Sequence, residues 1–215
     1  MSRFKLFVVA TAAVLLFSGC EQFFSTNLFS GLQRDPSNLS FDQQVSYAES
    51  ALNSGDQDAQ ADAYDALSES LEEENNTDPE LNDLAAELAI GASGLADTVP
   101  DLADAAINGD LSSQTDLENA LNDKLDDVDY SYVDEAASQL QKIQENGGEV
   151  SEEQYVFVAA GLLMKEADTQ GGVENLDAGN TTEEQQFVED AIADLESRDE
   201  SSPLLDDLKS MYDGL

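Results

Sequence analysis

The feature that most constrains this chain is a series of helix start and stop signals that recurs from residue 40 onward. Ser40-x-x-Gln43 and Ser151-x-x-Gln154 are capping boxes, in which a hydroxyl and an amide satisfy backbone N–H groups reciprocally. Asp78 before Pro79 is an N-cap with proline at the first helical position. Glycines that end helices follow at Gly55, Gly109, Gly147–Gly148 and Gly171–Gly172. These signals divide residues 40–215 into about nine helical segments.

Between the signals, apolar residues recur at helical spacing. Phe41, Val45, Ala48 and Leu52 share one face, and no segment shows the period-two alternation of a strand. Further stripes include Ala63, Leu67 and Leu71, then Leu81, Leu84, Ala85, Leu88, Ala92 and Leu95, and later Val133, Ala136, Ala137, Leu140 and Ile143. We therefore expect an all-α fold, and residues 40–215 are long enough for one sizeable core.

Three of the remaining segments have their own signals. Thr98 is expected to begin a helix that ends at Gly109, and Thr181 with Glu184 is expected to cap the eighth helix. Ser202-Pro203 starts the last one. The segment 155–168 is apolar on nearly all sides, which predicts a buried, central helix.

The caps that open alternate helices also suggest a repeat. They are Ser40, Asp78, Ser112 and Ser151, at spacings of 38, 34 and 39 residues. This is one helical hairpin per period, close to the ~34 residues of a tetratricopeptide repeat. The sequence ALNSGD at 51–56 is similar to AAINGD at 105–110.

Residues of the first hairpin match this family in part. Counted from Gly55, Ala48 and Tyr64 occupy its small and aromatic positions, whereas Gln60 and Leu67 stand where alanine is expected. Pro79 comes later than the proline that ends the family's repeat unit. The chain thus resembles a degenerate tetratricopeptide-like array, which implies an α-solenoid of stacked hairpins. A compact helical bundle is the alternative.

The first twenty residues indicate where the protein resides. Arg3 and Lys5 precede 12 apolar or small residues, Leu6–Phe17, and Ser18-Gly19-Cys20 follows. Twelve residues are too few to span a bilayer, which needs about 20. A basic start, a short apolar run and small residues are typical of a secretory signal peptide. Cys20 is the only cysteine of the chain.

The segment Phe17-Ser18-Gly19-Cys20 resembles the lipobox of bacterial lipoproteins, with Phe17 in place of the usual leucine. The resemblance implies cleavage of residues 1–19 and a lipid on Cys20, with residues 20–39 as a tether before the helical domain of residues 40–215. It places the protein on the cell membrane or outer membrane, facing the periplasm or the exterior. The alternatives are an unmodified cysteine behind an ordinary signal, or an N-terminal membrane helix.

The charge of the chain is strongly negative. It has 47 acidic and 8 basic residues, and without residues 1–19 the balance is 6 − 47 = −41. Such a chain is not expected to bind nucleic acid, whose affinity comes from Lys and Arg on phosphates. Disorder is not expected, because 41% of the residues are apolar and well patterned. At ~1 M salt the Debye length is about 3 Å, so self-repulsion is screened. We expect a halophilic source.

Several chemistries are excluded by composition. The chain has no histidine and no tryptophan, and lipidation of Cys20 removes its only thiol. Imidazole general bases, cysteine nucleophiles and the usual zinc sites are therefore absent. The segment 126–131 spaces oxygen ligands somewhat like a calcium loop, but lacks the sixth-position glycine and the twelfth-position glutamate. Asp56-x-Asp58 lacks that glycine too. We expect helix caps and solvated faces there, no enzyme, no cofactor and no metal site.

Our hypothesis is a lipid-anchored envelope protein that acts as a non-enzymatic protein-interaction scaffold. By resemblance, tetratricopeptide lipoproteins serve as assembly factors or as accessory parts of solute transporters, so a protein partner is expected. The alternative is an envelope lipoprotein that binds a small molecule or cation between helices. Tyr64, Tyr130 and Tyr132 are the candidate lining of a partner groove. Phe157 and Met164 are the candidate lining of a ligand cavity.

Overall fold

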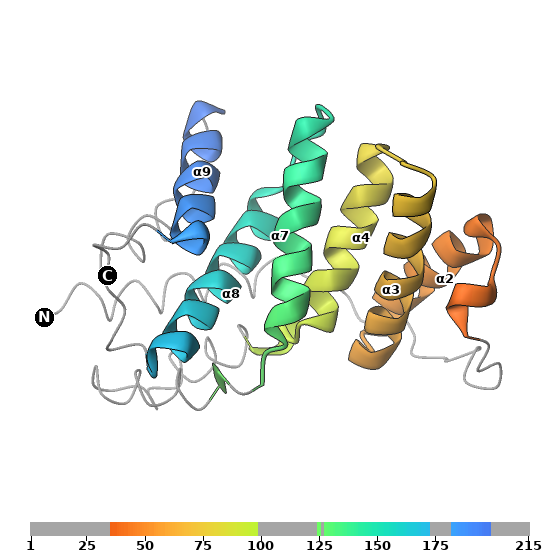
Figure 1. The fold of residues 1–215 in the computed structure, drawn as a ribbon, viewed down its shortest axis with the longest axis horizontal. Helices are drawn as coiled ribbons and strands as arrows, with labels where there is room; N and C mark the ends of the chain where they lie inside the picture. The colour runs from red at the N-terminus through yellow and green to blue at the C-terminus, as the bar shows by residue number, and fades with distance from the viewer. Residues whose placement is uncertain (1–34, 99–123, 126, 173–181, 199–215) are drawn as a thin grey trace, which may run out of the picture. The chain divides into compact units, whose positions relative to one another are not determined.

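The computed structural model describes residues 35–98, 124–125, 127–172 and 182–198, and all regular structure in these ranges is helical (Figure 1). The elements are η1 (Pro36–Asn38), α2 (Phe41–Ser54), α3 (Gln57–Glu73), α4 (Pro79–Ala92), α7 (Tyr130–Glu145), α8 (Glu152–Gln170) and α9 (Glu183–Ser197). The six α-helices among them coincide with six of the nine expected helices. The other three, expected over 98–109, 112–128 and 203–212, lie almost entirely outside the described residues.

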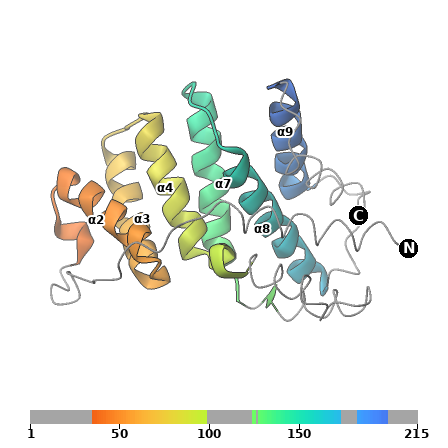
Figure 2. The same ribbon diagram turned by 180° about the vertical axis from the view of Figure 1, so that it is seen from behind.

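The chain divides into two compact units. The described residues of one are 35–94 and 131–150, which contain α2, α3, α4 and nearly all of α7; we call it the α2–α7 unit. The other contains α8 and α9, and we call it the α8–α9 unit. Within the α2–α7 unit, α3 packs against both α2 and α4. Both views show α7 beside α4, although a long stretch of sequence separates them (Figures 1 and 2).

The predicted capping signals form the helix ends. The Oε1 of Gln154 accepts the backbone N–H of Ser151 at 2.9 Å, and the Ser151 hydroxyl accepts the N–H of Gln154 at 3.2 Å. The Gln43 side chain likewise accepts the N–H of Ser40 at 3.2 Å. Asp78 accepts the N–H of Glu80 at 3.0 Å, and Pro79 is the first residue of α4, as predicted. These bonds satisfy N–H groups that a helix start leaves without an intrahelical partner.

Two predicted boundaries are wrong. The N-cap of α9 is Thr182, whose hydroxyl accepts the N–H of Gln185 at 3.2 Å; Thr181 itself lies outside the described residues. The third helix does not run to Leu95, because α4 ends at Ala92 and Gly94 has a φ of +80°. Residues 95–98 are already helical, so the next helix starts before Thr98. Leu95 is buried and continues the apolar spacing of α4 beyond this break. The sequence pattern therefore gives no sign that the helix ends.

The predicted apolar stripes are buried to different extents. Those of α3 and α7 are buried throughout. In α2 the buried face is rotated, so that Ala48 is buried together with Gln44 and Ala51, whereas Phe41, Val45 and Leu52 are half-buried. Eleven of the 19 residues of α8 are buried, which confirms that it is a buried helix. The cluster of Ala159, Leu163 and Val188, with Ile192 packed against it, joins α8 to α9.

A close approach joins α3 to α4. A Cβ on Gly91 of α4 would lie 2.0 Å from the Oε1 of Gln60 on α3. Gln60 is only 7% exposed, so its amide has little room to move away. Gly91 therefore makes space for the buried side chain of Gln60.

Candidate functional site

A tyrosine cluster joins α3 to α7. The hydroxyl of Tyr64 donates to the Oε2 of Glu135 at 2.7 Å and accepts from the Nε2 of Gln139 at 3.3 Å. The ring of Tyr132 meets that of Tyr64 edge to face, with centroids 5.7 Å apart and planes at 87°. The Tyr132 hydroxyl donates to the Oδ1 of Asp65 at 3.4 Å. Two helices that are distant in sequence are thus joined by hydroxyl–carboxylate bonds around an aromatic pair.

The electrostatics of this cluster keep the Tyr64 hydroxyl protonated. Burial raises the pKa of Tyr64 well above its ordinary value of 10.0, and the carboxylate of Glu135 beside it adds to the shift. Burial also raises the pKa of Asp65, as do the charges of Asp62 and Glu135, while the bond from Tyr132 opposes the rise. Tyr64 therefore serves as a hydrogen-bond donor and not as a base, and the arrangement holds α7 on α3.

The three tyrosines proposed to line a groove lie in different surroundings. Tyr64 is 3% exposed, so its ring belongs to the core of the α2–α7 unit. Tyr132 is half-buried against it. Tyr130 belongs to the α8–α9 unit and is half-buried, and its hydroxyl donates to the carbonyl of Leu125 at 2.9 Å. The structure thus brings Tyr64 and Tyr132 together, with Tyr132 the more accessible of the two.

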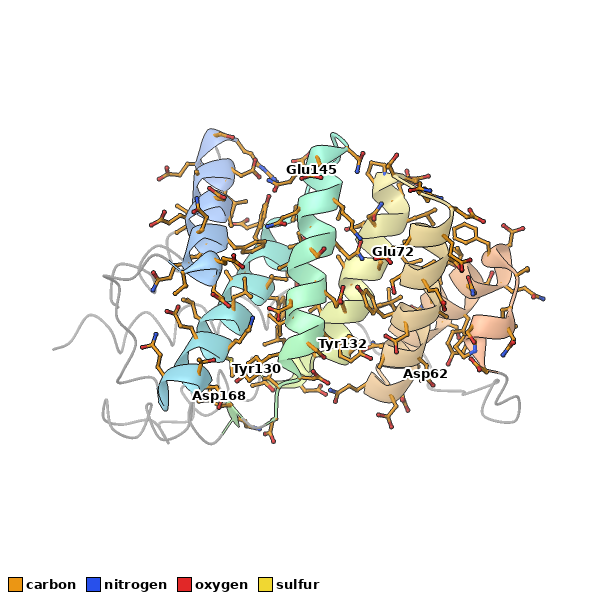
Figure 3. All side chains as sticks on the ribbon, viewed as in Figure 1. Asp62, Glu72, Tyr130, Tyr132, Glu145 and Asp168 are labelled. Atoms are coloured by element: carbon orange, nitrogen blue, oxygen red, sulfur yellow. The ribbon has the colours of Figure 1, made fainter. Side chains whose placement is uncertain are left out.

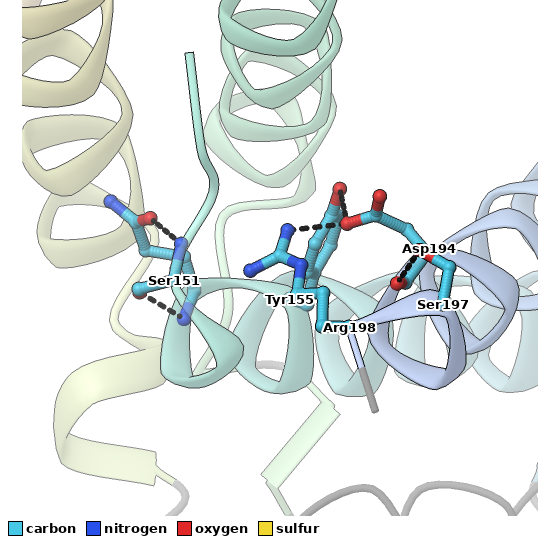
Figure 4. Close-up of polar contacts among 6 residues, drawn as sticks. Ser151, Tyr155, Asp194, Ser197 and Arg198 are labelled. Atoms are coloured by element: carbon cyan, nitrogen blue, oxygen red, sulfur yellow. Dashed lines mark hydrogen bonds and ion pairs between the residues drawn. The ribbon is translucent and has the colours of Figure 1, made fainter. Parts of the chain in front are cut away.

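The α8–α9 unit has a second polar cluster (Figure 4). The Tyr155 hydroxyl donates to the Oδ2 of Asp194 at 3.2 Å, and Arg198 forms an ion pair with the same carboxylate. The Arg198 guanidinium carbon lies 5.7 Å from the centre of the Tyr155 ring. Burial and then the charge of Asp194 raise the pKa of Tyr155, so this hydroxyl also remains a donor. The cluster fixes the start of α8 to the end of α9.

The opposite ends of these two helices meet at Glu166, which is 5% exposed. Its Oε1 accepts from the side-chain amides of Gln170 at 3.0 Å and Gln185 at 3.3 Å, and its Oε2 accepts from the Thr182 hydroxyl at 3.5 Å. Burial raises the pKa of Glu166, and the charge of Glu184 adds to the shift.

Glu184 has the opposite shift. Burial opposes its ionisation, but hydrogen bonds from its own backbone N–H and from Lys165 outweigh that effect and lower its pKa. The Lys165–Glu184 ion pair measures 3.0 Å. Two carboxylates and one lysine thus lie where the last turn of α8 meets the first turn of α9.

The other positions singled out in the sequence include Phe157, Met164, Cys20 and Asp56. Met164 is 7% exposed and Phe157 is half-buried, both on α8. Cys20 lies outside the described residues, so its lipidation stays a prediction. Asp56 caps α3 by accepting the N–H of Ala59 at 2.9 Å, which is the cap role expected of the acidic residues near the inter-helix loops.

The basic residues share one arrangement. Lys124, Lys142, Lys165 and Arg198, the four in the described ranges, each form an ion pair with a carboxylate. Lys142 of α7 reaches Glu72 of α3 at 4.0 Å. Exposed carboxylates such as Asp62, Glu72, Glu145 and Asp168 cover much of the remaining surface (Figure 3). Two of these four pairs, Lys142–Glu72 and Lys165–Glu184, join one helix to another, whereas Lys124–Asp127 and Arg198–Asp194 are local pairs three and four residues apart.

Metal and membrane features are both missing from the residues that the structure describes. No group of three acidic, cysteine or histidine side chains there could hold a metal ion. Among the same residues, no helix combines the length and the apolarity needed to cross a bilayer. The described part of the calcium-like segment, residues 127–131, shows Asp127 paired with Lys124 at 3.3 Å.

Sequence reasoning did not identify the partners of the buried hydroxyls. Glu135, Gln139 and Asp194 are polar residues within amphipathic helices, where a solvated face is the ordinary expectation. Glu166 and Gln185 likewise gave no signal, since their contact depends on how α9 packs on α8. The place of Glu166 inside the segment 155–168, which is apolar on nearly all sides, is the one feature that could have marked this position.

Comparisons with known proteins add no assignment. No protein-family profile matches the chain, and searches of curated proteins and of solved structures find no match.

Proposed function

We propose that this chain is a lipid-anchored protein of a bacterial cell envelope that acts as a non-enzymatic scaffold for a protein partner. The observation that supports the anchor is the position of the sole cysteine, Cys20, directly after a basic start, a 12-residue apolar run and two small residues. A diacylglycerol on this thiol together with a second acyl signal would anchor the chain stably, because one chain alone binds a membrane only marginally.

The scaffold role is supported by the kind of structure that the described residues form. They are helices joined as packed hairpins, with α2 against α3 and α8 against α9. Arrays of such hairpins bind partner segments on an extended surface. We propose a tetratricopeptide-like array of about nine helices. The recurring caps support it, since three of the four that open alternate helices, Ser40, Asp78 and Ser151, start helices as predicted.

The role as a binding protein agrees with the chemistry of the two polar clusters. Both use tyrosine hydroxyls as donors to carboxylates, and burial raises the pKa of both Tyr64 and Tyr155. Such groups stabilise helix packing and supply neither a general base nor a nucleophile. The excess of carboxylates supports a halophilic source, because a surface rich in carboxylates keeps a protein hydrated and soluble in concentrated salt.

The first test is the anchor. The full chain and its Cys20→Ser variant are expressed in a bacterial host, and membranes are separated from soluble material after metabolic labelling with a radioactive fatty acid. We expect the label and the membrane location for the natural sequence only. Equal membrane recovery of both forms without label would overturn the lipid anchor.

The second test is the partner. The lipidated protein is crosslinked in its native membranes at 2 M NaCl, isolated, and identified by mass spectrometry together with whatever it retains. One stoichiometric envelope protein is the expected result. Recovery of the chain alone would contradict the scaffold role and would favour the alternative, an envelope lipoprotein that binds a small molecule or a cation.

A further inference from the structure

The charges of α8 and α9 oppose the packing of these two helices against each other. α9 has six carboxylates and no basic residue, and α8 has four carboxylates and one lysine. The Lys165–Glu184 pair, at 3.0 Å, is the ion pair that links the two helices in the described residues. Arg198 at the C-cap of α9 pairs with Asp194 and lies over the ring of Tyr155, and both helices still keep an excess of negative charge.

One apolar cluster joins these helices within the residues that the structure describes. It consists of Ala159, Leu163 and Val188, with Ile192 packed against it, while Ala191 and Leu195 of α9 are buried as well. The tilted ring pair of Tyr155 and Phe187, with centroids 6.3 Å apart, extends it toward one end. Among the described elements, α9 packs chiefly against α8.

The highly charged helix of the other unit is better supported. α3 also has six carboxylates and no basic residue. However, α3 packs against α2 and α4, which have two and three carboxylates. Lys142 of α7 also reaches Glu72 on α3. Within the described residues, α3 thus has more helix partners than α9, so repulsion of equal strength is expected to loosen α9 first.

Salt concentration decides how strongly such charges interact. The Debye length is about 30 Å at 0.01 M salt, so every carboxylate of α9 is within reach of those of α8. At 1 M it is about 3 Å, so that only pairs in direct contact interact. High salt thus removes the repulsion between the helices, while the apolar contacts and the hydrogen bonds of Tyr155 and Glu166 remain.

We propose that the docking of α9 on α8 is a salt-operated joint, closed at molar salt and open at low ionic strength. Opening separates α9 from α8 and exposes Ala159 and Leu163, which are buried when α9 is docked. The joint uses the charges and contacts of these two helices and does not depend on the anchor or the scaffold role proposed above.

The test is hydrogen exchange of the full chain, read by mass spectrometry, at 2 M and at 20 mM NaCl. Exchange in peptides of α9 is compared with exchange in peptides of α4. We expect the transfer to low salt to speed exchange in α9 at least tenfold more than in α4. Choline chloride at 2 M should close the joint as NaCl does, because screening depends on ionic strength and not on the kind of cation.

A pair of variants identifies the cause. Asp168→Asn with Asp190→Asn removes one exposed carboxylate from each of the two helices at nearly constant size. The matched control, Asp42→Asn with Glu49→Gln, removes two exposed carboxylates from α2. The first variant should reduce the salt effect on α9 several-fold, and the control should leave it unchanged.

Three results would overturn the joint. In the first, α9 and α4 respond to salt by the same factor, which would show a general salt requirement of the fold. In the second, α9 keeps its protection at 20 mM NaCl. In the third, NaCl closes the joint and choline chloride does not, which would show binding of a specific cation.

Discussion

The hydroxyl of Tyr64 donates a 2.7 Å hydrogen bond to the carboxylate of Glu135, a residue 71 positions later in the chain. The bond lies at the edge of the core, since Tyr64 is buried and Glu135 is exposed. The same hydroxyl accepts from the amide of Gln139, one turn further along α7. One oxygen on α3 thus contacts two successive turns of α7.

Removal of this oxygen should weaken the α2–α7 unit. Tyr64→Phe leaves the buried Nε2 of Gln139 without its acceptor. A buried donor with no hydrogen-bond partner lowers the unfolding free energy by about 1–3 kcal/mol. Glu135→Gln retains an acceptor at an exposed position and should cost less than ~1 kcal/mol. Urea unfolding at 2 M NaCl measures both. Equal losses in the two variants would argue against the role given to Gln139.

Glu166 should make the folded state less stable as the pH rises, which is the opposite of the usual effect of a carboxylate. Its folded pKa lies above the ordinary value of 4.5, because burial and Glu184 disfavour its charge more than Thr182, Gln185 and Gln170 favour it. The folded state therefore binds this proton more tightly than the unfolded state does. The resulting stabilisation is complete below pH 4.5 and is lost as the pH rises through the folded pKa.

Glu166→Gln should accordingly raise the melting temperature at pH 7 and reduce the difference in melting temperature between pH 7 and pH 5. The pKa of the nearby Glu184 is lowered from 4.5, so this carboxylate stays ionised in the same range and the change isolates Glu166. Asp168→Asn on the same helix is the control for loss of one negative charge. If Asp168→Asn changes the pH profile as much as Glu166→Gln does, the buried carboxyl is not its cause.

Gly148 should tolerate no side chain. A Cβ there would lie 2.7 Å from the Cγ2 of Ile143 and 2.7 Å from the Cβ of Pro79. The Cβ of Pro79 is fixed by its ring, and the backbone oxygen of Ile143 would also lie only 3.2 Å away. Gly148→Ala should therefore lower the unfolding free energy by about 1–3 kcal/mol through overpacking. Gly147 has a φ of +78° and open space around it. Gly147→Asn, which tolerates this conformation, is the matched control and should cost less than ~1 kcal/mol.

Gly91 and Gln60 should behave as a coupled pair. Gly91→Ala alone places a methyl group 2.0 Å from the Gln60 Oε1 and should destabilise the unit, despite the better helix propensity of alanine. Gln60→Ala should restore space, so the double variant should regain most of the loss. Chemical unfolding of the four proteins gives the coupling energy. Additive effects would show that the two side chains do not compete for the same volume.

Local chemistry let the sequence determine the helices and most of their ends. Ser151 with Gln154, and Asp78 before Pro79, act on groups within four residues, so their effect needs no knowledge of the fold. The same holds for Gly55, whose φ of +66° ends α2. The buried stripes of α3 and α7 followed from helical periodicity. An exception is the end of α4, where apolar spacing continued across the turn at Gly94.

Only the tertiary structure decided which polar residues have buried partners. The helix sequences allow a solvated position for Glu135, Gln139 and Asp194, and they do not identify the partners of Glu166. Their roles depend on the rotation and spacing of packed helices, as the rotated buried face of α2 also shows. Helix formation is decided by interactions among near neighbours in sequence, whereas these contacts join residues 16 to 75 positions apart. The sequence therefore determined the elements, and packing determined the polar clusters that hold them together.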